Sequence, residues 1–264
     1  MLRGFISAGL ISGLAGGYAY AANWPTSQLF GPTLVAGNDP SEVALTYDDG
    51  PNDPWTERLL DLLSRHNVQA TFFLIGRFVR QRPGIARAIR SAGHVVGNHT
   101  MTHPVLLWKS PDRVREELAG CNAALEDALG EAVRFFRPPH GARRPDVLRA
   151  ARELGLTPVM WNGMGRDWTS PPAEQIVRRV QARIRANQRL RRGSNILLHD
   201  GGQACMGMDR GPTVAATAKL LRAWEPRGLR SVTVERWMDT FDSQSAASTL
   251  PGEPVKNGNS HQRP

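Results

Sequence analysis

Short apolar runs alternate along the chain with longer segments in which apolar residues recur at helical spacing. This alternation is typical of repeated strand–helix units that assemble a parallel sheet. The sequence predicts seven strands, at residues 42–47, 70–75, 94–97, 133–136, 157–161, 194–198 and 229–234. We therefore expect an α/β fold in which each of the first six strands leads towards a helix.

Helix boundaries and faces agree with this pattern. Asp53 precedes Pro54 and Ser110 precedes Pro111, and a capping residue followed by proline is a helix-start signal. Within residues 173–192, one stripe holds Ile176, Val180 and Ile184, and seven arginines crowd the remaining surface. We interpret this segment as the solvated outer face of a barrel helix rather than a dedicated polyanion site.

Adjacent carboxylates end the first predicted strand, in Thr46-Tyr47-Asp48-Asp49-Gly50-Pro51. Two neighbouring carboxylates repel each other, and burial adds to the cost of their charge. A cation, a basic side chain or a shared proton must relieve this conflict. Asp48 and Asp49 therefore indicate a charged site at the strand end.

A histidine pair, His99 and His103, follows the third predicted strand. Residues four apart turn to one side of a helical turn, and two neutral imidazoles with one carboxylate suit zinc with one position open. Alone, the pair is more typical of a solvated loop or of hydrogen-bonded core histidines. Together with Asp48 and Asp49, it predicts a metal site formed by Asp49, His99 and His103.

Further polar residues follow later predicted strands. Arg137 comes after the fourth strand, Asp167 after the fifth, and His199 and Asp200 after the sixth. In parallel α/β folds the site forms at the carboxyl ends of the strands, where residues distant in sequence converge. This convergence favours an enzyme.

Five ordered motifs resemble the signatures of polysaccharide deacetylases, carbohydrate esterase family four, over about residues 40–240. They are Thr46–Pro51, His99–His103, Arg137-Pro138-Pro139-His140-Gly141, Arg166-Asp167-Trp168 and Leu197-Leu198-His199. The resemblance implies a distorted (β/α)7-type barrel as a single catalytic domain. It also implies metal-dependent removal of acetyl groups from sugars.

The resemblance assigns roles to the residues of these motifs. It makes Asp48 the general base, oriented by Arg137, and His199 the general acid, tuned by Asp167. It makes a divalent metal, zinc by preference, the cofactor held by Asp49, His99 and His103. It further implies an oxyanion contact at His140, and an acetyl pocket walled by Trp168 and Leu197.

The chain departs from the family pattern in two places. His140 stands where tyrosine is common, and residues 162–165 lack an acidic residue that the family often carries upstream of the Asp-Trp pair. A backbone N–H contact at His140 would survive the first change. Both changes bear on the acceptor groove, so the motifs predict the substrate less directly than they predict the class of reaction.

The leading hypothesis is a hydrolase that removes N-acetyl groups from an amino-sugar polymer, either peptidoglycan or a chitin-like chain, and releases acetate. The nearest rival is an O-acetyl esterase acting on xylan or another glycan with the same metal site. A glycan-binding barrel without turnover and a redox iron enzyme are two further hypotheses. A base at Asp48 and an acid at His199 fit hydrolysis better than either of these two.

Composition adds information about partners. The 264 residues include 33 Lys plus Arg against 24 Asp plus Glu, a formal net charge of +9, which favours contact with anionic surfaces or polymers. No nucleic-acid motif accompanies the charge, so the expected partner is an acetylated polysaccharide and not nucleic acid. A monomer is expected. Cys121 lies on an apolar stripe and is interpreted as a buried thiol rather than a disulfide partner of Cys205.

The chain ends carry their own expectations. Residues 1–22 are apolar and glycine-rich and end in Ala19-Tyr20-Ala21-Ala22, typical of an export signal or of a retained membrane anchor. A buried N-terminal helix is the less favoured alternative, because the glycines of this segment weaken helix packing and propensity. Residues 23–39 are expected to be a linker, 40–241 the catalytic domain, and 242–264 a disordered tail. The expected location is periplasmic, at the cell surface or extracellular, with cell-wall or membrane association.

Overall fold

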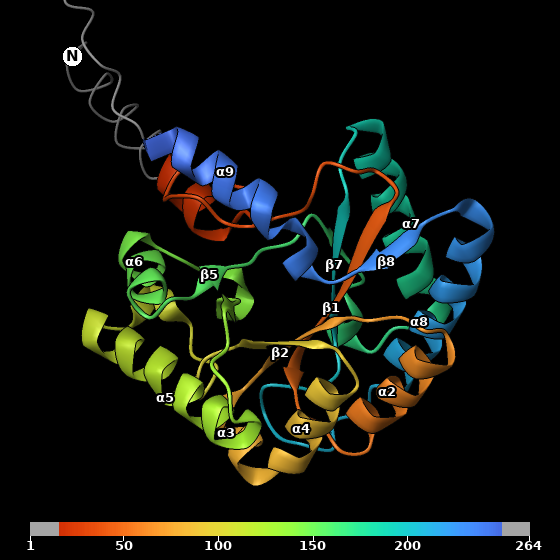
Figure 1. Cartoon of the computed structure of the whole chain (residues 1–264), viewed down its shortest axis with the longest axis horizontal. Helices are drawn as coiled ribbons and strands as arrows, with labels where there is room; N and C mark the ends of the chain where they lie inside the picture. Colours follow the sequence, from red (N-terminus) through yellow and green to blue (C-terminus); the bar gives the residue numbers. More distant parts are fainter. Residues whose placement is uncertain (1–15, 250–264) are drawn as a thin grey trace, which may run out of the picture.

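Eight parallel strands form one sheet that curves into a distorted barrel in the computed structural model, which describes residues 16–249 (Figure 1). The strands are β1 (Glu42–Gly50), β2 (Thr71–Leu74), β3 (Val95–Asn98), β4 (Phe135–Phe136), β5 (Thr157–Pro158), β6 (Gly163–Met164), β7 (Ser194–His199) and β8 (Arg230–Val232). Their order is β5-β4-β3-β2-β1-β7-β6, and β8 pairs with β1. No pairing joins β5 to β6 within the described residues, so the barrel is open there.

Helices surround the strands (Figure 1). They are α2 (Trp55–Arg65), α3 (Gly76–Gln81), α4 (Pro83–Ser91), α5 (Pro111–Leu129), α6 (Pro145–Glu153), α7 (Ala173–Arg189), α8 (Gly211–Trp224) and α9 (Met238–Thr249). The predicted α/β class and distorted (β/α)7-type barrel are confirmed.

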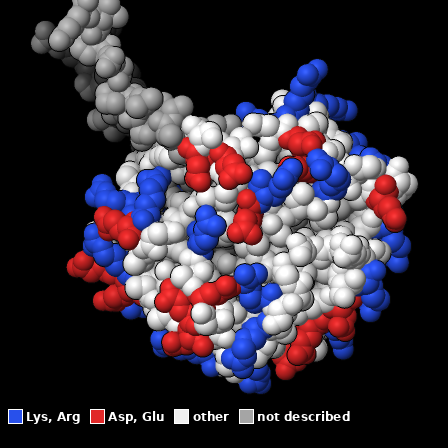
Figure 2. Space-filling view, in the orientation of Figure 1, with Lys and Arg blue, Asp and Glu red and all other residues white. Residues whose placement is uncertain are grey.

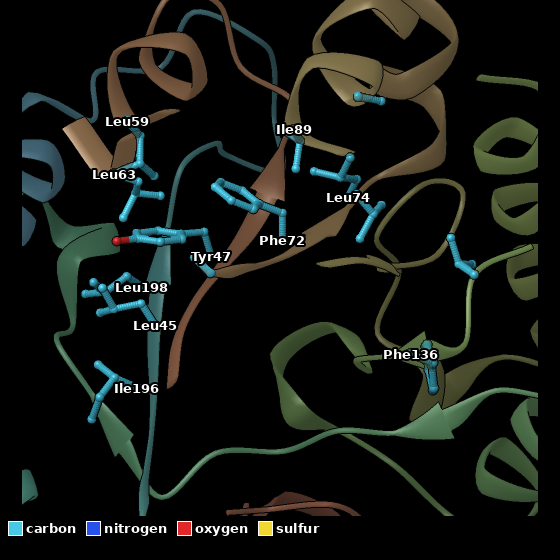
Figure 3. Close-up of a cluster of buried hydrophobic side chains, with 14 of the residues drawn as sticks. Leu45, Tyr47, Leu59, Leu63, Phe72, Leu74, Ile89, Phe136, Ile196 and Leu198 are labelled. Carbon is cyan, nitrogen blue, oxygen red and sulfur yellow. The ribbon is translucent and has the colours of Figure 1, made fainter. Parts of the chain in front are cut away.

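The two faces of β1 explain how the fold positions a site. Leu45 and Tyr47 point towards the surrounding helices (Figure 3), where the Tyr47 ring stacks on Phe72 at 5.2 Å between centroids. The alternate residues Thr46 and Asp48 are also buried but point to the opposite face, into the barrel. One strand therefore supplies both the hydrophobic core and the polar interior.

The segment predicted as a strand at 157–161 differs from the expectation. β5 covers only Thr157–Pro158, because Val159 pairs with Leu34 and the chain then crosses to β7. There Gly163–Met164 form β6, an eighth strand that the sequence analysis missed. Asp167 accordingly follows β6 rather than the predicted fifth strand.

One of the two predicted helix starts is wrong. Ser110 caps α5, where its hydroxyl accepts a hydrogen bond from the Arg113 backbone N–H at 3.2 Å. By contrast, α2 begins at Trp55 with Pro54 at the capping position and no side-chain cap. The Asp53 carboxylate instead lies 4.0 Å from the Arg82 guanidinium.

Other predictions about the helices are confirmed. Ile176, Val180 and Ile184 are the buried stripe of α7. Cys121 is buried in α5 and its thiol donates to the Leu74 carbonyl, while Cys205 is exposed, and neither forms a disulfide. Burial raises the pKa of the Cys121 thiol to about 12.

The ends of the described chain are more ordered than expected. Residues 16–23 are helical, and the region predicted as a linker packs on the barrel, where Leu34 is buried. Residues 242–249 continue α9 rather than beginning a disordered tail. Met238 is buried and Phe241 is partly buried against the barrel, which fixes the first turns of that helix, and extending an existing helix is far easier than starting one.

The predicted leader and tail extend beyond the described part of the chain. Residues 1–15 of the export signal or anchor and residues 250–264 of the tail lie outside the described residues. Among residues 16–249, none of the helices combines the length and apolar character needed to span a bilayer.

Candidate active site

The predicted site residues meet at the carboxyl ends of the strands. Asp48 and Asp49 lie at the end of β1, and His199 lies at the end of β7 directly beside Asp48 in the strand pairing. Leu197 lies within β7, two residues before its end, and the remaining residues come from the segments that follow β3, β4 and β6. Every residue proposed from the sequence lies on this edge of the sheet or in the loops that leave it.

Asp49, His99 and His103 form a compact cluster. The Asp49 Oδ1 atom lies 3.4 Å from His99 Nε2 and 3.2 Å from His103 Nε2. One potential ligand atom from each residue lies within 4.8 Å of the others. Asp49 Oδ1 is buried and has no hydrogen-bond partner among the described residues, as expected of a ligand atom that needs a cation. The three residues therefore fit a divalent metal.

A second contact prepares His99 for coordination. Its Nδ1–H donates to the backbone carbonyl of Arg137 at 2.7 Å. This bond fixes the tautomer, because a carbonyl only accepts, and it leaves the Nε2 lone pair directed at Asp49. Such outer contacts orient metal-binding histidines generally.

The histidine pair reaches this geometry without the predicted helical turn. The segment is a loop in which Thr100 has φ 66° and His103 has φ 60°. Buried Glu117 of α5 holds the loop, accepting hydrogen bonds from the Thr102 backbone N–H at 2.8 Å and hydroxyl at 2.6 Å. The sequence analysis missed Glu117, whose helical position gave no signal of this contact.

Histidine neighbours determine the charge of Asp49. Burial acts to raise the pKa of its carboxyl, but the close imidazoles of His103 and His99 outweigh burial and hold the pKa well below its usual range. Asp49 is therefore a carboxylate over the whole neutral range, which is the form that binds a cation.

Arg137 and Asp48 form a buried ion pair inside the barrel. The Arg137 Nη1 atom donates to Asp48 Oδ1 at 2.8 Å and to the Thr46 hydroxyl at 2.8 Å. The other carboxylate oxygen, Asp48 Oδ2, lies 3.7 Å from His99 Nε2 and faces the cluster. Arg137 thus holds the Asp48 carboxylate in one orientation. Thr46 and Asn195 also accept hydrogen bonds from the Arg137 guanidinium. The sequence analysis did not propose either residue, although each alternates along its strand with apolar residues that face the helices, which is the signal of a side chain that points into the barrel.

Asp167 binds His199 at two points. Its Oδ1 accepts from the His199 ring Nδ1 at 2.9 Å, and its Oδ2 accepts from the His199 backbone N–H at 2.8 Å. Thr213 of α8, a residue missed by the sequence analysis, donates to the same Oδ2. Burial acts to lower the pKa of His199, but the Asp167 charge and hydrogen bond raise it to about 9.

Three further residues line the site. The Trp168 ring is 44% exposed and meets the His199 ring edge-on at 5.5 Å between centroids. The His140 ring meets His103 at 4.7 Å, and the His140 backbone has φ 59°. Leu197 is buried in a small cluster with Met160 and Trp161.

Comparison with known proteins agrees with this geometry. The family model described as polysaccharide deacetylase matches residues 36–159. A chitooligosaccharide deacetylase from Sinorhizobium fredii is 40% identical over 199 residues, which are 73% of this chain and 90% of that protein.

The chain belongs to the polysaccharide deacetylase family.

Solved structures of this family superpose on the chain. The Bc1960 peptidoglycan N-acetylglucosamine deacetylase is 34% identical with a TM-score of 0.69, and the match covers 76% of this chain and 89% of that one. BA3943 from Bacillus anthracis, described as a pseudoenzyme of the same family, is 28% identical with a TM-score of 0.66. That match covers 74% of this chain and 64% of BA3943, less than two thirds.

The relatives described as deacetylases, which are 40% and 34% identical to the chain, identify it as an enzyme of this family. The family's third motif carries His140 here, and the His140 ring packs on His103 of the candidate metal cluster. The segment 162–165, which lacks the family's frequent acidic residue, contains the whole of β6 and one residue on either side of it. The Asn162 side chain in that segment binds the backbone of Gly193 and Asn195.

Proposed function

We propose that the protein is a zinc-dependent hydrolase that releases acetate from N-acetyl groups of an amino-sugar polymer, either peptidoglycan or a chitin-like chain. The observation that carries the proposal is the junction of β1 and β7. There Asp48, paired with Arg137, lies between the Asp49 cluster and His199. Relatives described as chitooligosaccharide and peptidoglycan deacetylases support this substrate class.

The donor set favours zinc among divalent cations. Two imidazole nitrogens and one carboxylate oxygen, from His99, His103 and Asp49, are a usual three-ligand set for catalytic zinc. When bound, the cation supplies the Lewis acidity that acidifies water and polarises an acetyl carbonyl. All further steps belong to side chains and backbone groups of the protein.

Asp48 is proposed as the general base. Arg137 occupies its Oδ1 atom, which leaves Oδ2 on the side of the metal ligands. From this position Oδ2 takes the proton of the attacking water. The fixed guanidinium prevents the carboxylate from turning away, so the base stays aligned without moving during the reaction.

His199 is proposed as the general acid. Amide cleavage requires a proton on the departing nitrogen, because an amide anion is a prohibitively poor leaving group. With a pKa of about 9, the imidazole is protonated at neutral pH. Asp167 occupies Nδ1, so the Nε2–H is the group that delivers the proton.

The loop after β4 is proposed to stabilise the oxyanion. The backbone N–H of His140 has no acceptor among the described residues, and the ring of the same residue lies against the metal ligand His103. Preorganised N–H donors of this kind contribute strongly to acyl transfer. Trp168, beside His199, and Leu197 would wall the acetyl pocket.

We further propose that the protein is exported and acts at the cell wall. Peptidoglycan lies outside the cytoplasmic membrane, and the first 22 residues have the composition of an export signal or anchor. Cell fractionation of tagged full-length protein tests this, with activity expected in the periplasmic, surface or medium fraction. Recovery only in the cytosol would contradict export.

The decisive experiment measures bound metal and acetate release on the full-length protein. N-acetylglucosamine oligomers are the test substrate, and an O-acetylated xylan oligomer of equal length is the comparison. Asp48→Asn is expected to retain metal and lose at least about 100-fold in kcat. Asp127→Asn, which changes an exposed carboxylate on α5, is the matched control.

Each result has a defined meaning. Acetate release from the N-acetyl substrate that Asp48→Asn abolishes supports the proposal. Faster turnover of the O-acetyl substrate would favour an esterase, whose alkoxide leaving group depends less on His199. Glycan binding with no acetate release from either substrate would indicate a non-catalytic barrel.

A further inference from the structure

Arg143, just beyond the third family motif, is buried without a carboxylate partner. It is 1% exposed, and no acidic side chain pairs with it within the described residues. Its guanidinium donates instead to three backbone carbonyls, those of Gly141 at 3.0 Å, Trp24 at 2.8 Å and Ser27 at 2.8 Å. A buried charge is costly unless it is fully hydrogen-bonded, so these bonds define where both partner segments lie.

The same residue makes a fourth connection through its backbone. The Arg143 N–H donates to the carbonyl of Ala22 at 3.0 Å. Ala22 is 1% exposed. Arg143 therefore joins residues 22–27 to the loop of residues 138–142 from both its main chain and its side chain.

The joined loop is conformationally strained. His140 has φ 59° and Gly141 has φ 69°, and consecutive residues in the left-handed region persist only where the surroundings hold them. A side chain at Gly141 would meet the Trp161 ring at 2.6 Å, so the loop also has no room to relax inwards. The bond from Arg143 to the Gly141 carbonyl fixes the peptide unit between Gly141 and Ala142, one residue beyond His140.

The Arg143 guanidinium remains charged although it is buried. The pKa of Arg143 falls to about 10, which still keeps it protonated at neutral pH. All its bonds to carbonyl oxygens therefore remain charge-assisted and short. A neutral side chain of similar length would leave two or three carbonyls without a donor.

We propose that Arg143 is a positioning residue for deacetylation, which holds the His140 backbone N–H in place by clamping the loop of residues 138–142 to residues 22–27. The inference rests on the proposed oxyanion role of His140. It makes residues 22–27, predicted as the end of a leader and the start of a linker, a working part of the enzyme. These residues contact no reacting atom and act only through the loop.

The first test uses four variants of the full-length protein. Arg143→Gln removes the charge, and Ala22→Trp forces residues 22–27 off the barrel because no space exists for the larger side chain. The third variant combines both changes. Arg152→Gln is the matched control, since Arg152 also donates to a carbonyl of the N-terminal segment, that of Pro32 at 3.0 Å, but lies in α6.

Arg143→Gln is expected to lower kcat by about 10- to 100-fold, with KM and bound metal unchanged. A displacement of about 1 Å in a catalytic group is sufficient for such a loss, and an oxyanion contact matters only in the transition state. Ala22→Trp is expected to reproduce the loss. The double variant should lose no more than either single variant, because both break one clamp, and Arg152→Gln should retain wild-type kcat.

Arg143→Lys separates positioning from folding. Lysine keeps the charge but presents its donors from one point rather than a planar fork, so a kcat between those of wild type and Arg143→Gln is expected at similar thermal stability. Full activity of Arg143→Lys with an unfolded Arg143→Gln would overturn the proposal and leave Arg143 a stability residue. So would multiplicative losses in the double variant.

Failure of the inference and failure of the proposed function give different results. If the wild-type protein releases no acetate, the proposed function fails. If the wild type is active and Arg143→Gln matches Arg152→Gln in kcat, only the clamp fails.

Discussion

At the scale of single residues, His199 shows how one carboxylate determines both position and protonation. Asp167 accepts from its ring and from its backbone N–H, while Thr213 completes the carboxylate's bonding. The imidazole can therefore neither rotate nor change tautomer freely. The raised pKa of His199, about 9, follows from the same contacts.

Asp167→Asn is expected to move the alkaline limb of kcat to lower pH. A general acid acts only while protonated, so activity falls as pH rises through its pKa. Removing the Asp167 charge removes the main cause that raises this pKa, and a displacement of at least about one pH unit should follow. Full pH profiles of the variant and of Asp127→Asn measure it. Coincident alkaline limbs would show that another group is the acid.

Arg137 is expected to contribute to both stability and catalysis. Arg137→Met leaves Asp48 as a buried carboxylate without its partner, which costs about 3–5 kcal/mol of unfolding free energy. Adding Asp48→Asn removes the unpaired charge and should recover part of that loss. Urea unfolding of the two single variants and the double variant measures the coupling. Additive losses would contradict a direct ion pair.

At the scale of elements, the end of β1 is packed too tightly to tolerate a side chain on the neighbouring turn. A Cβ atom at Gly201 would lie 2.0 Å from the Asp49 backbone carbonyl oxygen, and backbone atoms have little freedom to move. The position of Asp49 in the proposed metal site thus depends on Gly201, which is not one of the proposed ligands.

Gly201→Ala is therefore expected to displace Asp49 and reduce bound metal to well below one equivalent. Gly84→Ala is the matched control, because a Cβ there meets nothing within 4 Å, and alanine within α4 should be neutral or stabilising by about 0.5–1 kcal/mol. Metal analysis of both purified variants decides the matter. Full metal content in Gly201→Ala would show that the turn relaxes without moving the ligand.

The sequence predicted the elements whose signals are local. The strand ending in Asp48 and Asp49, the Ser110 cap and the α7 stripe are each encoded within a few residues. β6 was not predicted because it has only two residues. It pairs with β7 because the chain crosses the barrel at this point, and no apolar run in the sequence marks it. α2 begins one residue later than the Asp53-Pro54 signal predicted.

The candidate site divides in the same way. Asp48, Asp49, His99, His103, Arg137, Asp167 and His199 follow strands, so a prediction of strands was sufficient to bring them together. Glu117, Thr213 and Arg143 support the site from helices and a loop, through contacts that depend on tertiary structure. The backbone carbonyls that Arg143 binds have no signature in sequence at all.

At the scale of the whole molecule, the charged side chains on the surface are distinct from the buried charged side chains of the candidate site. Basic and acidic side chains are interspersed on the face shown in Figure 2, which presents no continuous basic patch despite the net charge of +9. The charges that matter for chemistry are buried at the strand ends. Binding of a cation at these strand ends is expected to change the stability of the whole barrel.

The proposed metal site joins two separate parts of the fold, because Asp49 lies at the end of β1 whereas His99 and His103 lie in the segment after β3. A ligand that binds only the folded state stabilises it by about 2.7 kcal/mol at 100 times its dissociation constant. Thermal unfolding temperature should therefore fall on chelation and rise with the logarithm of free zinc. Asp49→Asn should unfold at a temperature that zinc barely changes, whereas Asp48→Asn should keep the wild-type response, because Asp48 is the proposed base and not a ligand. An equal zinc response in Asp49→Asn would place the cation elsewhere.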